Sequence, residues 1–172
     1  MVRVLIIAAL LSATSALGAE PEWVAIFGRG ADAADTDIVR LGYRFPLKDN
    51  GHWWMPSHAQ LGGSIWRVPD LAGTTRRFDL NATAIWRAER GWGYYEGGFG
   101  GYLLSKTIHN DDTSIPSAFE FGSHLGIGYR LARDHTIGLG FQHISNGGIK
   151  QPNGGINLLL LQYTVSTGTP NR

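Results

Sequence analysis

The chain has 172 residues, a formal net charge of +1 and no cysteine. This length fits one domain. The small net charge implies no strongly electrostatic partner, and no basic cluster with interleaved aromatic residues suggests nucleic acid. Without disulfides the fold needs another source of stability, and a closed barrel that pairs every backbone group is one solution.

The first 19 residues have the layout of a secretory signal peptide. A short positive start (1–3) precedes an apolar run (4–17), and Ala16 and Gly18 place small residues before a cleavage point at Ala19 or Glu20. An N-terminal membrane anchor is the alternative, but the apolar run is short against the roughly 20 residues of a spanning helix. The sequence therefore predicts a signal peptide over 1–19 and a single mature domain over 20–172.

The composition of the chain narrows the fold class. Glycine accounts for 24 residues, about twice the average usage. The six Trp and six Tyr residues are side chains that suit membrane interfaces. After the signal no segment approaches the roughly 18 consecutive apolar residues of a membrane-spanning helix. A water-soluble β-protein and an outer-membrane barrel remain.

Alternating segments separated by turn-rich gaps predict strands throughout the mature chain. Most are long enough for the roughly 9 to 11 residues of a tilted membrane-crossing strand, and eight is the smallest strand number in outer-membrane barrels. We therefore expect an all-β fold, an eight-stranded antiparallel transmembrane β-barrel of the outer-membrane type. The predicted strands are 22–29, 35–46, 58–68, 77–88, 91–105, 117–131, 135–146 and 155–166.

The gaps between these segments predict the orientation of the barrel. Gaps 87–91 and 131–134 are short and charged, as periplasmic turns are, whereas longer polar gaps resemble extracellular loops. With both termini in the periplasm, the seventh strand ends at the outer rim. The gap 47–57 is long for a periplasmic turn, so it either lies along the inner interface or the strand count is wrong there. The predicted extracellular loops are 69–76, 106–116 and 147–154.

The seventh strand carries the residues with the clearest chemistry. Residues two apart share a face of a strand, so His143 and Ser145 follow the apolar face of Ile137, Leu139 and Phe141. The opposite face is small or polar, which suits the crowded interior of an eight-stranded barrel. The histidine and serine are therefore expected on the lipid-facing wall, near the headgroups of the outer leaflet.

A histidine beside a serine suits ester hydrolysis through a covalent acyl-enzyme. His143 would take the proton of Ser145 and later return it to the leaving alcohol. The residues after the serine, 146–148, include two glycines whose N–H groups are free to turn toward an oxyanion. The eighth strand runs antiparallel to the seventh, which brings Asn157 near His143.

The segment HISNGGIKQPNGGIN closely resembles the signature of the lipid A deacylase family, PagL. Members of that family are eight-stranded barrels of the bacterial outer membrane, and they hydrolyse the ester-linked acyl chain at the 3 position of lipid A in lipopolysaccharide. The resemblance implies that His143 is the base and Ser145 the nucleophile, that Asn146 and Gly148 supply oxyanion donors, and that Asn153 supports the loop. It implies no metal or cofactor, and it leaves both a monomer and a homodimer open.

The chain departs from the pattern at the third position of the triad, where the best-known member has a glutamate and this chain has Asn157. An amide oxygen can hold the histidine tautomer but brings no charge, and an Asp-to-Asn change costs a serine protease about 10⁴ in rate. Either Asn157 serves with its oxygen turned to the histidine, or Glu120 or Glu96 helps. Lys150 is either a contact to substrate phosphate or a solvated side chain.

The sequence thus predicts a lipid A 3-O-deacylase. Two other functions compete with it. The first is a structural or binding barrel that kept the fold but lost turnover, which Asn157 favours. The second is a phospholipase or acyltransferase that acts on other lipids of the outer leaflet.

Overall fold

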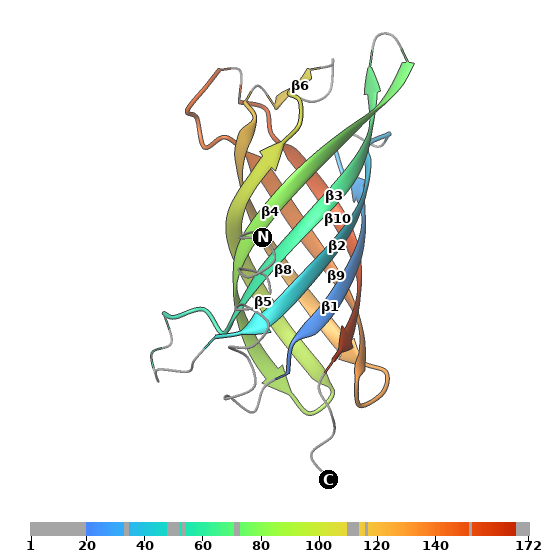
Figure 1. Ribbon diagram of the computed structural model, residues 1–172, viewed down its shortest axis with the longest axis vertical. Coiled ribbons are helices and arrows are strands. Elements are labelled where there is room, and N and C mark those ends of the chain that lie inside the picture. The colour runs from blue at the N-terminus through green and yellow to red at the C-terminus, as the bar shows by residue number, and fades with distance from the viewer. Residues whose placement is uncertain are drawn as a thin grey trace, which may run out of the picture.

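Eight long strands close into an antiparallel barrel in the computed structural model (Figure 1), which confirms the predicted fold class. The structure describes residues 20–32, 35–47, 52, 54–70, 73–109, 114–115, 117–151 and 153–167, so the predicted signal peptide lies outside it. The order around the barrel is β1-β10-β9-β8-β5-β4-β3-β2. The barrel strands are β1 (Glu22–Gly30), β2 (Asp37–Pro46), β3 (His58–Asp70), β4 (Gly73–Arg90), β5 (Gly93–Leu104), β8 (Phe119–Arg130), β9 (His135–Ser145) and β10 (Ile156–Ser166).

Strict alternation of exposed and buried residues builds the barrel wall. In β1 every second residue is buried, and β10 follows the same period. The two strands pair from Glu22 with Ser166 to Gly30 with Leu158, which closes the sheet and leaves no edge. Large apolar side chains cover the outside, as the lipid-facing band of such barrels requires. Among them are Phe27, Val39, Leu41, Ile65, Phe78, Leu80, Leu103, Leu125, Leu139 and Leu159.

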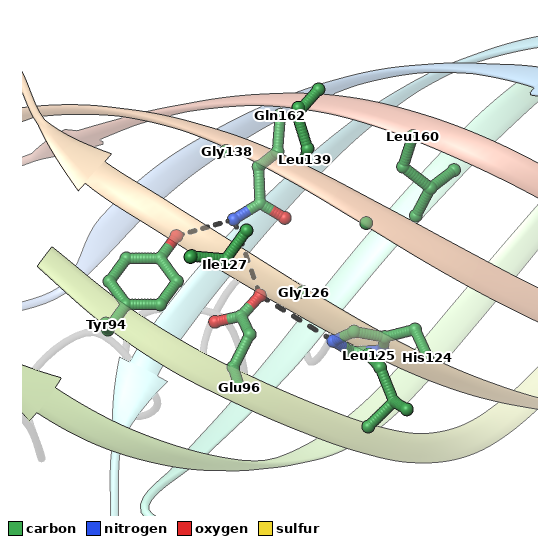
Figure 2. Close-up of a pocket in the computed structure, with 11 residues that line it drawn as sticks. Tyr94, Glu96, His124, Leu125, Gly126, Ile127, Gly138, Leu139, Leu160 and Gln162 are labelled. Carbon is green, nitrogen blue, oxygen red and sulfur yellow. Dashed lines mark hydrogen bonds and ion pairs between the residues drawn. The ribbon is translucent and has the colours of Figure 1, made fainter.

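The interior is filled by side chains, with an apolar cluster that includes Ile38, Trp66 and Leu158 and a polar cluster around Glu96. Figure 2 shows Glu96 reaching into the lumen, with Gln162 and His124 directed toward its carboxylate. The same carboxylate pairs with Arg44 and Arg87 at 3.1 Å each. Within the described part of the chain, no helix is long and apolar enough to cross a membrane.

Glycines on the inner faces of β5 and β8 make room for these large groups. A Cβ atom on Gly98 would lie 2.1 Å from the ring of His124, and one on Gly128 would lie 2.4 Å from the ring of Tyr94. Real Cβ atoms do not approach so closely, so a larger residue at either position would displace the ring. Large side chains on the neighbouring strands thus account for glycines in β5 and β8.

The outer rim differs from the prediction at two loops. Most of 69–76 is strand, because β3 and β4 stay paired up to Asp70 and Gly73, and Figure 1 shows them projecting beyond the other strands. Thr74 and Thr75 are β-branched and suit a strand although they are polar, and a hairpin above the membrane needs no apolar face. The loop 106–116 contains a short pair of strands, β6 (Ile108–His109) and β7 (Ser114–Ile115).

The long gap 47–57 does not signal an error in the strand count. Leu47 N–H donates to Ser57 O at 2.9 Å, and Ser57 N–H donates to Ile85 O at 2.8 Å, which ties the end of the gap to β4. Trp86 Nε1 donates to the carbonyl of Trp54 at 3.0 Å. Residues 48–51 and 53 lie outside the described chain. The bond from Trp86 holds Trp54 of the gap against β4 at the inner end, where aromatic belts form.

Candidate active site

The outer end of β9 carries His143 and Ser145 on the outside of the barrel. The preceding outward residues Leu139 and Phe141 are 64% and 44% exposed, whereas Gln142 is 1% exposed and points into the lumen. His143 and Ser145 continue the outward set and are half-buried. The predicted face is therefore correct, and the pair stands on the lipid-facing wall where β9 enters the loop 147–154.

Asn157 lies directly opposite His143 in the antiparallel pairing of β10 with β9. The Nδ1 atom of His143 and the Oδ1 atom of Asn157 are 2.8 Å apart. Because an amide oxygen only accepts, the ring proton resides on Nδ1, and Nε2 keeps the lone pair that a general base needs. The geometry thus places Asn157, the predicted third residue, in contact with His143.

The two carboxylates considered as alternatives to Asn157 point into the lumen. Glu96 is occupied by Arg44 and Arg87, and Glu120 accepts from the Ser117 hydroxyl at 2.7 Å. The expectation that Glu96 or Glu120 helps His143 is wrong. Strand parity explains this: β8 pairs Phe121 with Ser145, so Glu120, one residue earlier, faces the opposite side of the wall.

Gly155 is a site residue that sequence reasoning missed. It has a φ of +65°, and a Cβ atom there would lie 3.0 Å from His143 Cε1 and 3.0 Å from Ser145 Cβ. The imidazole and the serine therefore approach the same point, which only a residue without a side chain leaves open. No hydrogen bond joins His143 to Ser145, and in free enzymes such bonds often tighten only when the substrate binds. The glycine pair before Ile156 was the available signal in the sequence.

The turn after Ser145 is organised by the buried side chain of Asn146. Its Oδ1 accepts from Gly148 N–H at 2.9 Å, its Nδ2 donates to Lys150 O at 2.8 Å, and its main-chain N–H donates to Asn153 Oδ1 at 3.1 Å. The first of these closes an Asx turn. The predicted residues thus lie together, and Asn153 is hydrogen-bonded to the turn. The N–H groups predicted as oxyanion donors, those of Asn146 and Gly148, are engaged within the turn.

An apolar groove with a volume of about 240 Å³ opens beside the serine and crosses from β9 to β5. Phe121 lies opposite Ser145, and Phe99 stacks on Phe121 with ring centroids 5.8 Å apart. Gly147 lines the groove, and its N–H makes no hydrogen bond to another described residue. The two phenylalanines belong to the site, and nothing in their sequence context indicated it. The groove is lined by Phe99, Phe121, Ser123, His143, Ser145 and Gly147.

The remaining chemistry of the site is limited to these groups. Lys150 is exposed on the turn. Across the residues whose placement is described, no group of three or more His, Cys, Asp or Glu side chains is arranged to hold a metal ion. The arrangement offers a hydroxyl, a base with a fixed proton, amide donors and an apolar groove, which together suit acyl transfer from a lipid ester.

Comparison with protein families gives a match to the family described as Lipid A 3-O-deacylase (PagL), over residues 37–166. Lipid A deacylase PagL of Bordetella bronchiseptica is 34% identical over 132 residues, covering 73% of this chain and 74% of that protein. Lipid A deacylase PagL of Pseudomonas aeruginosa is 25% identical over 144 residues, covering 79% and 82%.

Two solved structures share the fold. A crystal structure of the outer membrane enzyme PagL aligns with a TM-score of 0.66 at 23% identity, covering 84% of this chain and 98% of that one. The N-terminal barrel domain of Pseudomonas aeruginosa OprF aligns with a TM-score of 0.51 at 14% identity, covering 86% and 96%. The family match spans β2 to β10 and includes every predicted site residue.

Proposed function

Because this chain belongs to the lipid A 3-O-deacylase (PagL) family, we propose that Ser145 and His143 hydrolyse the ester at the 3 position of lipid A. The protein is a bacterial outer-membrane barrel, and its substrate is the lipid A of that membrane. The observation that carries the assignment of residues is the 2.8 Å contact of His143 Nδ1 with Asn157 Oδ1. This contact directs the basic Nε2 of His143 away from β10. His143 itself lies on the outer wall of the barrel, which lipid reaches laterally.

The reaction proceeds through an acyl-enzyme. Ser145 Oγ attacks the ester carbonyl while its proton passes to His143 Nε2. The tetrahedral intermediate collapses, the bond to the sugar oxygen breaks, and the 3-alkoxide takes the proton from Nε2. Water then loses a proton to His143 and attacks the acyl ester on Ser145. This attack forms a second tetrahedral intermediate, whose collapse releases the fatty acid. His143 then returns the proton to Ser145 Oγ.

The turn 146–148 supplies the donors for the oxyanion. Gly147 N–H is unengaged among the described residues and lies at the groove beside Ser145. The N–H groups of Asn146 and Gly148 now donate to side-chain oxygens, and they join Gly147 by exchanging those acceptors for the oxyanion as it forms. Removing one such donor typically costs 10² to 10³ in rate. Lys150, exposed on the same turn, contacts a phosphate of the substrate.

The groove beside Ser145 receives the acyl chain. Its walls are the rings of Phe99 and Phe121, and the apolar outer surface of β9 continues below it through Leu139 and Phe141. A chain anchored in the outer leaflet therefore lies along the wall with its ester at the level of the serine. Water reaches the same point from the polar loop above, which the second half of the reaction requires.

The mature protein begins near Glu20. Residues 1–19 act as a cleaved signal peptide, because a short basic start, an apolar run and small residues before the cleavage point occur in that order. The intact mass of protein isolated from outer membranes should correspond to a chain starting at Ala19 or Glu20. A mass that includes residue 1 would contradict this.

Mass spectrometry of lipid A from cells that express the chain tests the function. We expect one 3-position acyl chain to be lost with the wild type and to be retained with Ser145→Ala. Ser166→Ala, which removes a hydroxyl from the inner end of β10, is the matched control and should retain activity. Intact lipid A with a folded wild-type barrel would instead establish the silent barrel, and loss of acyl chains from phospholipids alone would establish the phospholipase.

A further inference from the structure

We propose that Asp32 is a positioning residue for His143 and acts through the amide of Asn157. This inference rests on the proposed function, since it assigns a role within the same reaction. It identifies a carboxylate that stands behind the amide, at a position where no sequence motif indicated one. Asp32 also lies N-terminal to the segment that the family model matches.

The position of Asp32 follows from the closure of the barrel. β1 pairs with β10, and just beyond the end of β1 the main-chain N–H of Ala31 donates to Asn157 O at 2.8 Å. This bond carries the next residue over the outer end of β10. Hydrogen bonds then connect the side chains of His143 on β9, Asn157 on β10 and Asp32 in the segment after β1.

Asp32 accepts two hydrogen bonds from Asn157. Its Oδ1 accepts from the main-chain N–H of Asn157 at 3.1 Å, and its Oδ2 accepts from Nδ2 at 2.6 Å. Because the first bond goes to the backbone, the carboxylate is held at a defined place relative to β10. The second bond is short, as expected when the acceptor is ionised.

These bonds decide which way the amide of Asn157 points. The oxygen and nitrogen of an amide are nearly the same size, so packing alone does not distinguish its two orientations. A carboxylate accepts but does not donate, and it therefore requires Nδ2 on its own side. Oδ1 must then face His143, the ring must carry its proton on Nδ1, and Nε2 must be the base. A flipped amide would place Oδ1 against the carboxylate, which breaks that contact, and Nδ2 against Nδ1, which would move the ring proton to Nε2 and leave no base there.

Asp32 also returns a charge to the site. During the reaction His143 becomes an imidazolium, and the amide between it and Asp32 is polarised by the carboxylate on its far side. An Asp-to-Asn change disables a serine protease mainly because the histidine adopts the wrong tautomer. Here Asp32 orients the amide so that His143 keeps the correct tautomer, and Asn157 can therefore serve as the third residue of the triad.

The proposal is tested by measuring the kinetic effect of Asp32→Ala in two backgrounds, the wild type and Asn157→Glu. In the wild-type background Asp32→Ala should lower kcat about 10- to 100-fold with little change in KM, the range expected for losing a charge-assisted hydrogen bond. In an Asn157→Glu background a carboxylate contacts His143 directly, so Asp32→Ala should cost nothing and relieve a like-charge contact. Asp35→Ala is the matched control, because Asp35 lies in the same loop and makes no hydrogen bond to Asn157 or His143.

Two results would overturn the proposal. One is an equal loss from Asp32→Ala in both backgrounds, which indicates that the residue only supports the loop. The other is unchanged kcat in the wild-type background. Where Asp32→Ala does not fold, Asp32→Asn keeps the volume of the side chain but removes its charge and its preference for one orientation of the Asn157 amide. This variant should show the same dependence on the residue at position 157.

A spectroscopic measurement separates this proposal from the proposed function. In protein with ¹⁵N-labelled histidine that carries Ser145→Ala, turnover is absent by design, and the ring nitrogens of His143 still report the tautomer. We expect the Nδ1–H form, and a shift toward the Nε2–H form with Asp32→Ala. An unchanged tautomer would refute the role of Asp32 even if the barrel deacylates lipid A. The expected shift would support it even if the substrate proves to be another lipid.

Discussion

Gly155→Ala tests whether the empty space between His143 and Ser145 is required. The added methyl group would lie 2.8 Å from Ile144 O, 3.0 Å from His143 Cε1 and 3.0 Å from Ser145 Cβ. The contact to the carbonyl is the decisive one, because backbone cannot rotate away as a side chain does. Ile144 stands between His143 and Ser145, so a shift of its backbone moves both of them.

The structure gives the size of two separate effects. An L-residue at a φ of +65° costs about 1–2 kcal/mol, which is small against the roughly 5–15 kcal/mol of a typical fold. The variant should therefore still form the barrel. A misplacement of about 1 Å at reacting groups costs about 10² in rate, so we expect activity near one hundredth of the wild type.

The assay compares initial rates of acyl release from lipid A in detergent micelles with the fraction of folded barrel seen as heat-modifiable migration on gels. Gly91→Ala is the control, since a Cβ atom at Gly91 meets nothing within 4 Å in the turn at the inner end. A Gly155→Ala enzyme that is folded and within twofold of wild-type activity would refute this account of the site.

Two further variants test the interior and the groove. Glu96→Gln removes one of the two carboxylates that Arg44 and Arg87 share in the lumen, while Glu22 remains. We therefore expect a loss of about 1–3 kcal/mol in stability, the cost of leaving a buried polar group short of a partner, measured by urea unfolding in micelles; an unchanged midpoint would contradict the role of this ion pair. Phe121→Ala removes a wall of the groove beside Ser145 and should raise KM for lipid A about tenfold with kcat little changed. Phe27→Ala on the outer face of β1 should leave both constants unaltered, and equal effects from the two variants would show that the groove has no special role.

The fold was largely predictable because the alternation of apolar and small residues is a local property of each strand. It sets strand type, strand number and which face meets lipid, and all three are confirmed. The prediction of 69–76 as a loop was wrong because polar residues indicate departure from the membrane. They do not indicate the end of pairing between β3 and β4.

The site residues likewise differ in how far the sequence alone could place them. His143 and Ser145 are two residues apart on one strand, so the sequence alone determined that they share the outer face, and the motif that they begin indicated the family. Asn157 required only the hairpin of β9 with β10 to be placed near His143, and the structure gives that contact at 2.8 Å.

Only the closed barrel decided what completes the site. Asp32 lies 125 residues from Asn157 along the chain, and it comes into contact because β1 seals against β10. Phe121 and Phe99 reach Ser145 through the pairing of β8 with β9 and β5, and Gly155 is explained by the space that two other residues need. Such contacts depend on register between strands, which no local pattern encodes, whereas the proposed base and nucleophile, His143 and Ser145, lie on one strand.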